Sequence, residues 1–174
     1  MVEYTTIQLI RMRADDFAAF KQRTIHACGQ GRALAGEWSA QEAPGRAAAD
    51  FAQQLPAGLA TPGNHLFVLT VAEDGRAVGD LWLAEHLVGK HKVAVLRHLH
   101  IGAADRQRGF AKQALRMAEA LARQLGCQEM RLQLFGHNAI ARTMYDGLGF
   151  RIMSMELAKL LPAEQRQAND HHGF

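Results

Sequence analysis

The sequence predicts a single α/β domain built on a mixed, mostly antiparallel sheet that is flanked by helices. Three observations lead to this prediction. The chain has 174 residues, of which 48% are hydrophobic, which is enough for one core and too short for two ordinary domains. Short runs rich in β-branched and aromatic residues alternate with turn signals, as is typical of strands. Longer segments with apolar residues at helical spacing separate some of these runs.

The N-terminal third predicts one strand followed by two helices. Residues 4–12 (YTTIQLIRM) read as a strand. Asp15 and Asp16 are expected to cap a helix that runs toward Gly29. Ser39 and Glu42 have capping-box spacing and predict a second helix that reaches about residue 55.

The middle of the chain predicts three strands and a long helix. Residues 65–72 and 77–86 are strand-like runs joined by the turn signal Asp74-Gly75, which indicates a hairpin. Residues 93–102 are apolar at both odd and even positions except for Arg97, His98 and His100, as expected for a strand covered on both faces. Apolar residues at helical spacing then predict a helix that ends at Gly126.

The last third predicts a strand, a short helix and a final strand. Residues 130–135 alternate in polarity, and Asn138 can cap a helix that is closed by Gly149. Residues 151–161 (RIMSMELAKLL) are expected to form a last strand, which could pair across a homodimer. The predicted domain covers residues 1–161, and the polar residues 162–174 are expected to be a disordered tail.

Composition narrows the classes of function. The formal net charge of +3 permits a polyanionic partner and also fits a domain with one phosphate pocket. Aromatic and basic residues are not interleaved, which argues against a nucleic-acid-binding module. The two cysteines, Cys28 and Cys127, form no CxxC motif and predict neither a disulfide framework nor a zinc site. Without a signal-peptide pattern or a membrane-length apolar segment, we expect a cytoplasmic protein with no membrane partner.

A basic turn precedes the predicted long helix. Arg106, Arg108 and Lys112 surround Gly109 directly after the apolar strand. A helix N-terminus has unpaired amides and a partial positive charge, so it attracts phosphate, and a glycine lets the backbone approach a ligand closely. The alternative interpretation is a solvated basic turn. The turn lacks the Gly-Lys-Ser/Thr of a Walker A loop and the further glycines of a dinucleotide fingerprint.

A second segment makes the pattern specific. Asn138, Ala141, Tyr145 and Gly149-Phe150 follow the turn in this order. Together with Arg106, Gly109 and Ala111 they resemble the motifs of the GNAT superfamily of acyl-CoA-dependent N-acetyltransferases. The resemblance covers approximately residues 66–161, and the first sixty residues match only in layout.

The resemblance implies where a cofactor would bind. In this superfamily the pyrophosphate of the acyl-CoA lies on the loop at the helix start, and the pantetheine pairs with the preceding strand. The implied cofactor-binding residues are Leu99, Ile101, Arg106, Arg108, Gly109, Phe110, Ala111, Lys112 and Asn138. Leu99 would supply a backbone amide that polarises the thioester carbonyl.

The resemblance also implies the catalytic groups. Tyr145 corresponds to the general acid that protonates the departing thiolate, although it could instead be a packed tyrosine. The strand before the basic turn lacks the glutamate base of some relatives, so His98 is the preferred base. His100, Glu85, His86 and water remain alternatives, and a strand bulge could redirect either histidine of the strand. A metal site is not expected, because His98 and His100 have no convincing third ligand.

The function expected from these residues is transfer of an acetyl group from acetyl-CoA, as co-substrate, to a primary amine of a small molecule, peptide or protein. Two alternatives stay open. One is an acyltransferase that uses a longer acyl-CoA. The other is a non-catalytic module that binds acyl-CoA or nucleic acid on the same fold.

Overall fold

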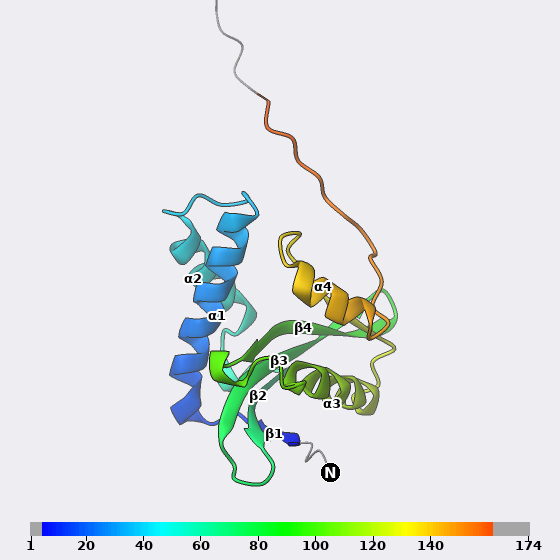
Figure 1. Cartoon of the computed structure of the whole chain (residues 1–174). Coiled ribbons are helices and arrows are strands. Elements are labelled where there is room, and N and C mark those ends of the chain that lie inside the picture. The colour runs from blue at the N-terminus through cyan, green and yellow to red at the C-terminus, as the bar shows by residue number, and fades with distance from the viewer. Residues whose placement is uncertain (1–4, 162–174) are drawn as a thin grey trace, which may run out of the picture.

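The computed structural model describes residues 5–161, which form one domain with a sheet between two layers of helices (Figure 1). The strands are β1 (Ile7–Arg11), β2 (Asn64–Val71), β3 (Ala77–Val88), β4 (His91–Ile101) and β5 (Glu129–Leu132). The α-helices are α1 (Ala14–Leu34), α2 (Ala43–Gln54), α3 (Phe110–Gln124) and α4 (Ala139–Asp146). Two short 3₁₀ turns are η1 (Gly58–Ala60) and η2 (Ala103–Asp105).

The five strands lie in chain order, β1-β2-β3-β4-β5. Neighbours are antiparallel from β1 to β4, whereas β4 and β5 are parallel. The parallel pair follows from α3, which lies between the two strands in the chain and returns it to the starting end of β4. The predicted mixed, mostly antiparallel sheet is therefore confirmed.

Each face of the sheet is covered by one pair of helices (Figure 1). On one face, α1 and α2 enclose a cluster that includes Phe20, Phe51 and Trp82. On the other face, α3 supplies a strip of buried small and apolar residues against the strands, and side chains of α4 pack against the same cluster. Both faces of the central strands are therefore buried, as the apolar residues at odd and even positions of β4 predict.

Both helices predicted in the N-terminal third are present, but their caps and ends differ from the prediction. Asp15 and Asp16 do not cap α1, because Arg13 is the N-cap residue and makes no side-chain cap bond; the two acids lie in the first turn. The helix also continues past Gly29 to Leu34. Ser39 and Glu42 do form a reciprocal pair, with the Glu42 amide 3.2 Å from the Ser39 hydroxyl, but α2 begins only at Ala43.

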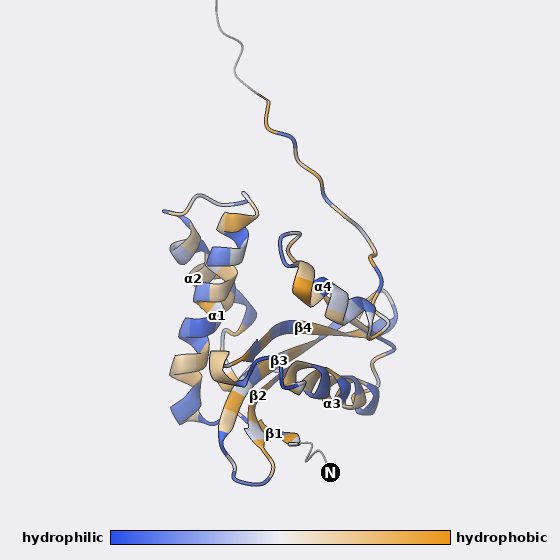
Figure 2. Ribbon diagram, viewed as in Figure 1, coloured by the Kyte–Doolittle hydropathy of each residue, from blue (hydrophilic) through white to orange (hydrophobic). Residues whose placement is uncertain are grey.

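The predicted final strand is wrong. Residues 151–161 have no regular secondary structure and extend away from the sheet (Figure 1). An apolar sequence alone is insufficient, because a strand is stable only when its backbone groups bond to a neighbour. These residues pair with no strand in the part of the chain described. The segment includes hydrophobic residues, coloured orange in Figure 2. Their side chains are exposed, with Leu157 at 85% and Leu160 at 97%.

The structure also bears on the expectations about the cysteines, membrane-spanning segments and the C-terminal tail. Cys28 and Cys127 are both free thiols. Among residues 5–161, no helix is long and apolar enough to cross a membrane. The expected tail, residues 162–174, lies outside the described residues.

Candidate active site

A bulge in β4 decides which side chains face which layer. Leu83 pairs with Leu96 but Trp82 pairs with His98, so Arg97 is an extra residue in the strand. An extra residue reverses the alternation beyond it. His98 therefore lies on the same face as Trp82, toward α1, and not on the face of Leu96, toward α3.

The backbone of β4 beyond this bulge has an edge that β5 leaves free. The two parallel strands pair only from Val93 to Leu96 and from Glu129 to Leu132. On the β3 side, the Gly102 amide donates to the Val78 carbonyl at 2.8 Å. Because alternate residues of a strand bond to opposite neighbours, the backbone groups of Ile101 and Leu99 point to the free edge.

The loop at the end of β4 contains two residues with a left-handed backbone conformation. Gly109 has φ +80° and is the N-cap residue of α3, and Gln107 has φ +61°. A residue with a side chain seldom adopts this left-handed conformation, so its presence at Gln107 indicates a loop held by its surroundings. Alternation of left-handed residues at a helix start directs successive amides toward one side, which suits phosphate oxygens.

One buried carboxylate organises this loop, and the sequence interpretation assigned it no role. Asp105 is 6% exposed and accepts two hydrogen bonds from Arg76, at 2.9 and 3.0 Å. It also accepts one from Arg108 at 3.0 Å. The guanidinium of Arg76 holds the pKa of Asp105 below its ordinary value, against the opposing effect of burial.

The basic side chains of the loop are thus partly occupied within the protein. Arg108 is shared between Asp105 and the ring of Phe110, and Arg106 donates to the Ile101 carbonyl at 3.3 Å. Lys112 is exposed on the first turn of α3. The Phe110 side chain is 1% exposed in the core, so only its backbone amide is available to a ligand.

Tyr145 lies on α4 with its ring half-buried against the core that α3 and the sheet share. Phe150 meets it edge-on, with ring centroids 5.5 Å apart. Burial raises the pKa of the Tyr145 phenol, so the hydroxyl stays protonated throughout the neutral range. The Asn138 side chain caps α4 by accepting from the Ala141 amide at 3.1 Å, which confirms the predicted cap and occupies its oxygen.

His98 and His100 lie side by side on one face of β4, with ring centroids 6.3 Å apart. The Nε2 atom of His98 is 2.8 Å from Oδ1 of Asp80, a carboxylate on β3 that the sequence interpretation missed. The one available signal was a single acid within residues 77–84, the otherwise apolar first part of β3. Burial lowers the pKa of His100, and the charge of Asp80 opposes that effect.

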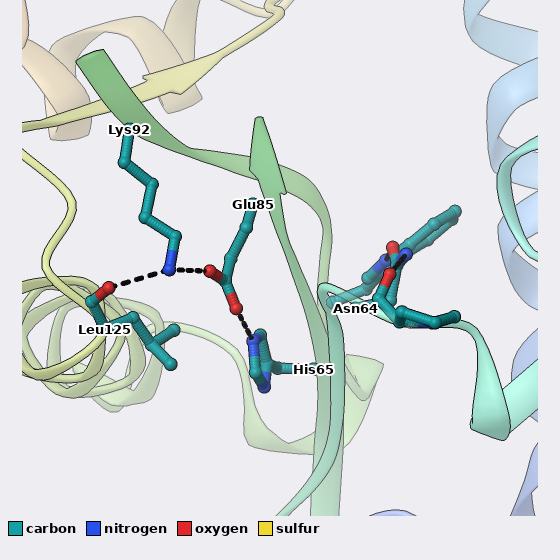
Figure 3. A network of polar contacts seen from close by, with 7 residues as sticks. Asn64, His65, Glu85, Lys92 and Leu125 are labelled. Carbon is teal, nitrogen blue, oxygen red and sulfur yellow. Dashed lines mark hydrogen bonds and ion pairs between the residues drawn. The ribbon is translucent and has the colours of Figure 1, made fainter. Parts of the chain in front are cut away.

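Glu85 and His86, the other candidate bases, are engaged elsewhere. Glu85 lies on the opposite face of the sheet from His98. Its carboxylate forms an ion pair with Lys92, and its Oε1 is 2.7 Å from Nε2 of His65 (Figure 3). Lys92 also donates to the Leu125 carbonyl at 2.9 Å. Lys92 and His65 hold the pKa of Glu85 below its ordinary value. This network joins the sheet to the C-terminal end of α3.

His86 accepts a hydrogen bond from Arg97 at 2.8 Å. Burial first and the Arg97 charge second lower the pKa of His86. Within residues 5–161, no group of three or more His, Cys, Asp or Glu side chains is arranged to hold a metal ion.

The sheet order, the bulged β4, the short parallel β4–β5 pair and the glycine-containing loop before α3 together define an acetyltransferase fold. The model of the acetyltransferase (GNAT) family matches residues 32–150, and the chain belongs to this family.

Two relatives from Bacillus subtilis (strain 168) have a similar sequence over nearly their whole length. The uncharacterised N-acetyltransferase YycN is 30% identical over 156 residues, which cover 90% of this chain and 99% of YycN. The uncharacterised N-acetyltransferase YdgE is 26% identical over 150 residues, covering 86% of this chain and 95% of YdgE.

Solved structures agree on the fold. The crystal structure of YycN superposes with a TM-score of 0.85 and covers 91% of this chain and all of that chain. The aminoglycoside N-acetyltransferase AAC(6′)-Iy, solved with a bisubstrate analogue of coenzyme A, is 19% identical with a TM-score of 0.59 and covers 91% of this chain and 100% of its own. At that identity the second likeness supports the fold alone.

Proposed function

We propose that this protein transfers an acetyl group from acetyl-CoA directly to a primary amine. The observation that carries the proposal is the continuous backbone surface formed by the free edge of β4 and the loop that follows it. Leu99 and Ile101 offer backbone groups along the edge, and Gln107 and Gly109 give the loop its anion-directed amides. A pantetheine amide chain that ends in a pyrophosphate matches such a surface.

The chemistry divides among three groups. The amine nitrogen attacks the thioester carbonyl carbon, whose oxygen is polarised by the Leu99 amide, and the carbon–sulfur bond then breaks. The departing thiolate takes the proton of the Tyr145 phenol, which burial keeps protonated. The proton lost by the amine goes to His98, the preferred base.

The cofactor is tested by thermal unfolding with ligands. A ligand that binds only the native state stabilises it by about 2.7 kcal/mol at a hundredfold excess over Kd. We expect acetyl-CoA to raise Tm more than butyryl-CoA, octanoyl-CoA or duplex DNA. A larger shift with a longer acyl-CoA would reassign the donor, and a shift with DNA alone would reject the enzyme.

The reaction is tested by thiol release with a panel of amines. We expect at least one small amine, peptide N-terminus or lysine peptide to release coenzyme A and gain an acetyl group by mass spectrometry. In the active pair, His98→Ala should flatten the acidic limb of the pH profile of kcat/KM. An unchanged limb would move the role to His100, Glu85, His86 or water.

We also propose that the protein forms a homodimer through its exposed C-terminal segment. Met153, Met155 and Leu157 alternate with polar residues and are 60–85% exposed. A hollow of about 480 Å³ lies beside β5, between α3 and residues 148–153. Burying these side chains against a second copy would remove exposed apolar surface from water.

Light scattering after size exclusion tests the dimer. Replacing all three residues with serine should convert a dimer to a monomer. Ile140→Ser on α4, where the side chain is 88% exposed, is the control and should leave the mass unchanged. A monomeric parent protein would contradict the proposal.

A further inference from the structure

Asp80 is a buried carboxylate whose two oxygens face two different partners. The residue is 2% exposed on β3. Its Oδ2 accepts from Arg23 of α1, with Nη2 at 2.8 Å and Nε at 3.0 Å. Its Oδ1 is 2.8 Å from Nε2 of His98, and neither atom forms a well-aligned hydrogen bond with any other described residue.

The Asp80 carboxylate does more than link α1 to the sheet through Arg23, because its second oxygen faces His98. A buried charge without partners is strongly unfavourable, and Arg23 satisfies only one side of the carboxylate. The other side depends on a hydrogen from His98. An ionised carboxylate can only accept, so the ring nitrogen that faces it must carry the proton.

We propose that Asp80 is a positioning residue that fixes His98 as the tautomer protonated on Nε2, which leaves Nδ1 free to accept a proton from the amine. The proposal rests on the proposed function, in which His98 is the base. In the step concerned, the amine N–H bond breaks, the proton bonds to Nδ1, and the nitrogen lone pair forms the new bond to the acetyl carbon. The imidazolium that results lies against the charge of Asp80, as an orienting carboxylate requires.

The surroundings of His98 support this role. The Phe20 ring meets the imidazole edge-on, at 5.6 Å between centroids and an angle of 87°, which restricts its rotation. No described residue makes a hydrogen bond to Nδ1. The charged or titratable groups that face His98 are Asp80 on β3, Arg23 on α1 and His100 on β4, while Arg106 acts on His100.

The ionisation states fit as well. Burial raises the pKa of Asp80, but His98 and Arg23 outweigh it and leave the pKa below its ordinary value. Burial lowers the pKa of His100, and the charge of Asp80 opposes that effect. Asp80 is therefore a carboxylate throughout the neutral range.

Asp80→Asn separates this role from a purely structural one. Arg23 can only donate, so the amide oxygen of the asparagine should turn to Arg23 and the amide nitrogen to His98. An N–H facing Nε2 requires that nitrogen to be unprotonated, and the imidazole must then carry its proton on Nδ1. The substitution should therefore invert the tautomer and remove the base.

Arg23→Gln is the matched control. It also abolishes the ion pair between α1 and β3, but it leaves Asp80 facing His98. Loss of the ion pair between α1 and β3 is therefore common to both variants. Only Asp80→Asn should change the tautomer.

Two measurements on the full chain test whether Asp80 sets the tautomer of His98 and whether that tautomer is needed for catalysis. Long-range ¹H–¹⁵N NMR of the neutral imidazole should show the proton of His98 on Nε2 in the parent and in Arg23→Gln, and on Nδ1 in Asp80→Asn. With the active amine, kcat should fall about a hundredfold to ten-thousandfold in Asp80→Asn, the range of general base catalysis. The KM for acetyl-CoA should stay near that of the parent, and Arg23→Gln should keep most of its kcat.

Each outcome has a definite meaning. A parent protonated on Nδ1 overturns the proposal even if Asp80→Asn fails to fold. An inverted tautomer with a kcat equal to that of Arg23→Gln also overturns it. A parent with the proton on Nε2 that acetylates no amine contradicts the proposed function, because the tautomer is measured without turnover.

Discussion

Arg76, the last residue of the β2–β3 turn, binds both carboxylate oxygens of Asp105, which lies 29 residues further along the chain in the loop before α3. The hairpin thereby holds the loop that we propose for the pyrophosphate. Asp105 itself never faces the ligand in this interpretation. It neutralises Arg76 and aligns Arg108, so the shape of the loop depends on its charge.

The Asp105 carboxylate gives the loop a predicted acid dependence. Its pKa is lowered by Arg76, so its contribution is present above the unfolded-state pKa of about 3.9 and is lost as pH falls through the lower folded-state pKa. Arg76→Leu removes that effect, so the loss should begin at a higher pH. At neutral pH the variant should bind acetyl-CoA roughly tenfold more weakly, as expected from a disturbed charge-assisted contact.

Calorimetric titration of acetyl-CoA between neutral pH and pH 4 checks this prediction. Arg123→Leu is the control, because Arg123 forms an exposed pair with Glu119 at 3.4 Å on α3. Exposed pairs contribute little, so its affinity should equal that of the parent. Equal affinities for both variants at every pH would show that Arg76 does not support the loop.

Gly109 and Gly126 provide a matched test of the phosphate loop. They lie at opposite ends of α3, with φ +80° and +77°, and a β-carbon at either position would meet nothing within 4 Å. Alanine in this conformation costs about 1–2 kcal/mol at each position. Both variants should lose similar stability in urea unfolding, but only Gly109→Ala should weaken acetyl-CoA binding in calorimetry. Equal binding by the two variants would reject the assignment of the loop.

Tyr145→Phe should separate packing from chemistry. Phenylalanine keeps the ring that packs against Phe150 and the core, but it cannot give a proton to the thiolate. We expect an unchanged Tm and acetyl-CoA affinity, with a single-turnover rate about a hundredfold to ten-thousandfold lower. If the single-turnover rate is retained, Tyr145 serves only in packing.

Gly31 should tolerate no side chain without a rearrangement. A β-carbon there would stand 2.3 Å from Cε2 of Phe135, in the segment that follows β5. Gly31→Ala should displace that ring and cost about 1–3 kcal/mol, as overpacking does. Gly45→Ala, in α2 and with open space around it, should instead gain about 0.5–1 kcal/mol from helix propensity. Urea unfolding measures both, and a gain for Gly31→Ala would show that Phe135 moves freely.

Local patterns in the sequence determined most of the architecture of this protein. Turn residues, apolar periodicity and caps act over a few residues, so the hairpin at Asp74-Gly75, the helix end at Gly126 and the Asn138 cap could all be predicted. The family could also be predicted, because the loop around Gly109 is followed along the chain by Asn138 and Tyr145 in the order of the family's motifs.

Tertiary structure alone decided the contacts between distant segments. The Arg97 bulge arises from pairing with β3, and it turns His98 toward Asp80, which is 18 positions away in the chain. The contact between Arg76 and Asp105 likewise joins segments that only the folded chain brings together. Residues 151–161 show the reverse case: their apolar sequence predicts a strand, yet a strand also needs a neighbour with free backbone groups. Local propensity is set by adjacent residues, whereas pairing partners are set by how the whole chain folds.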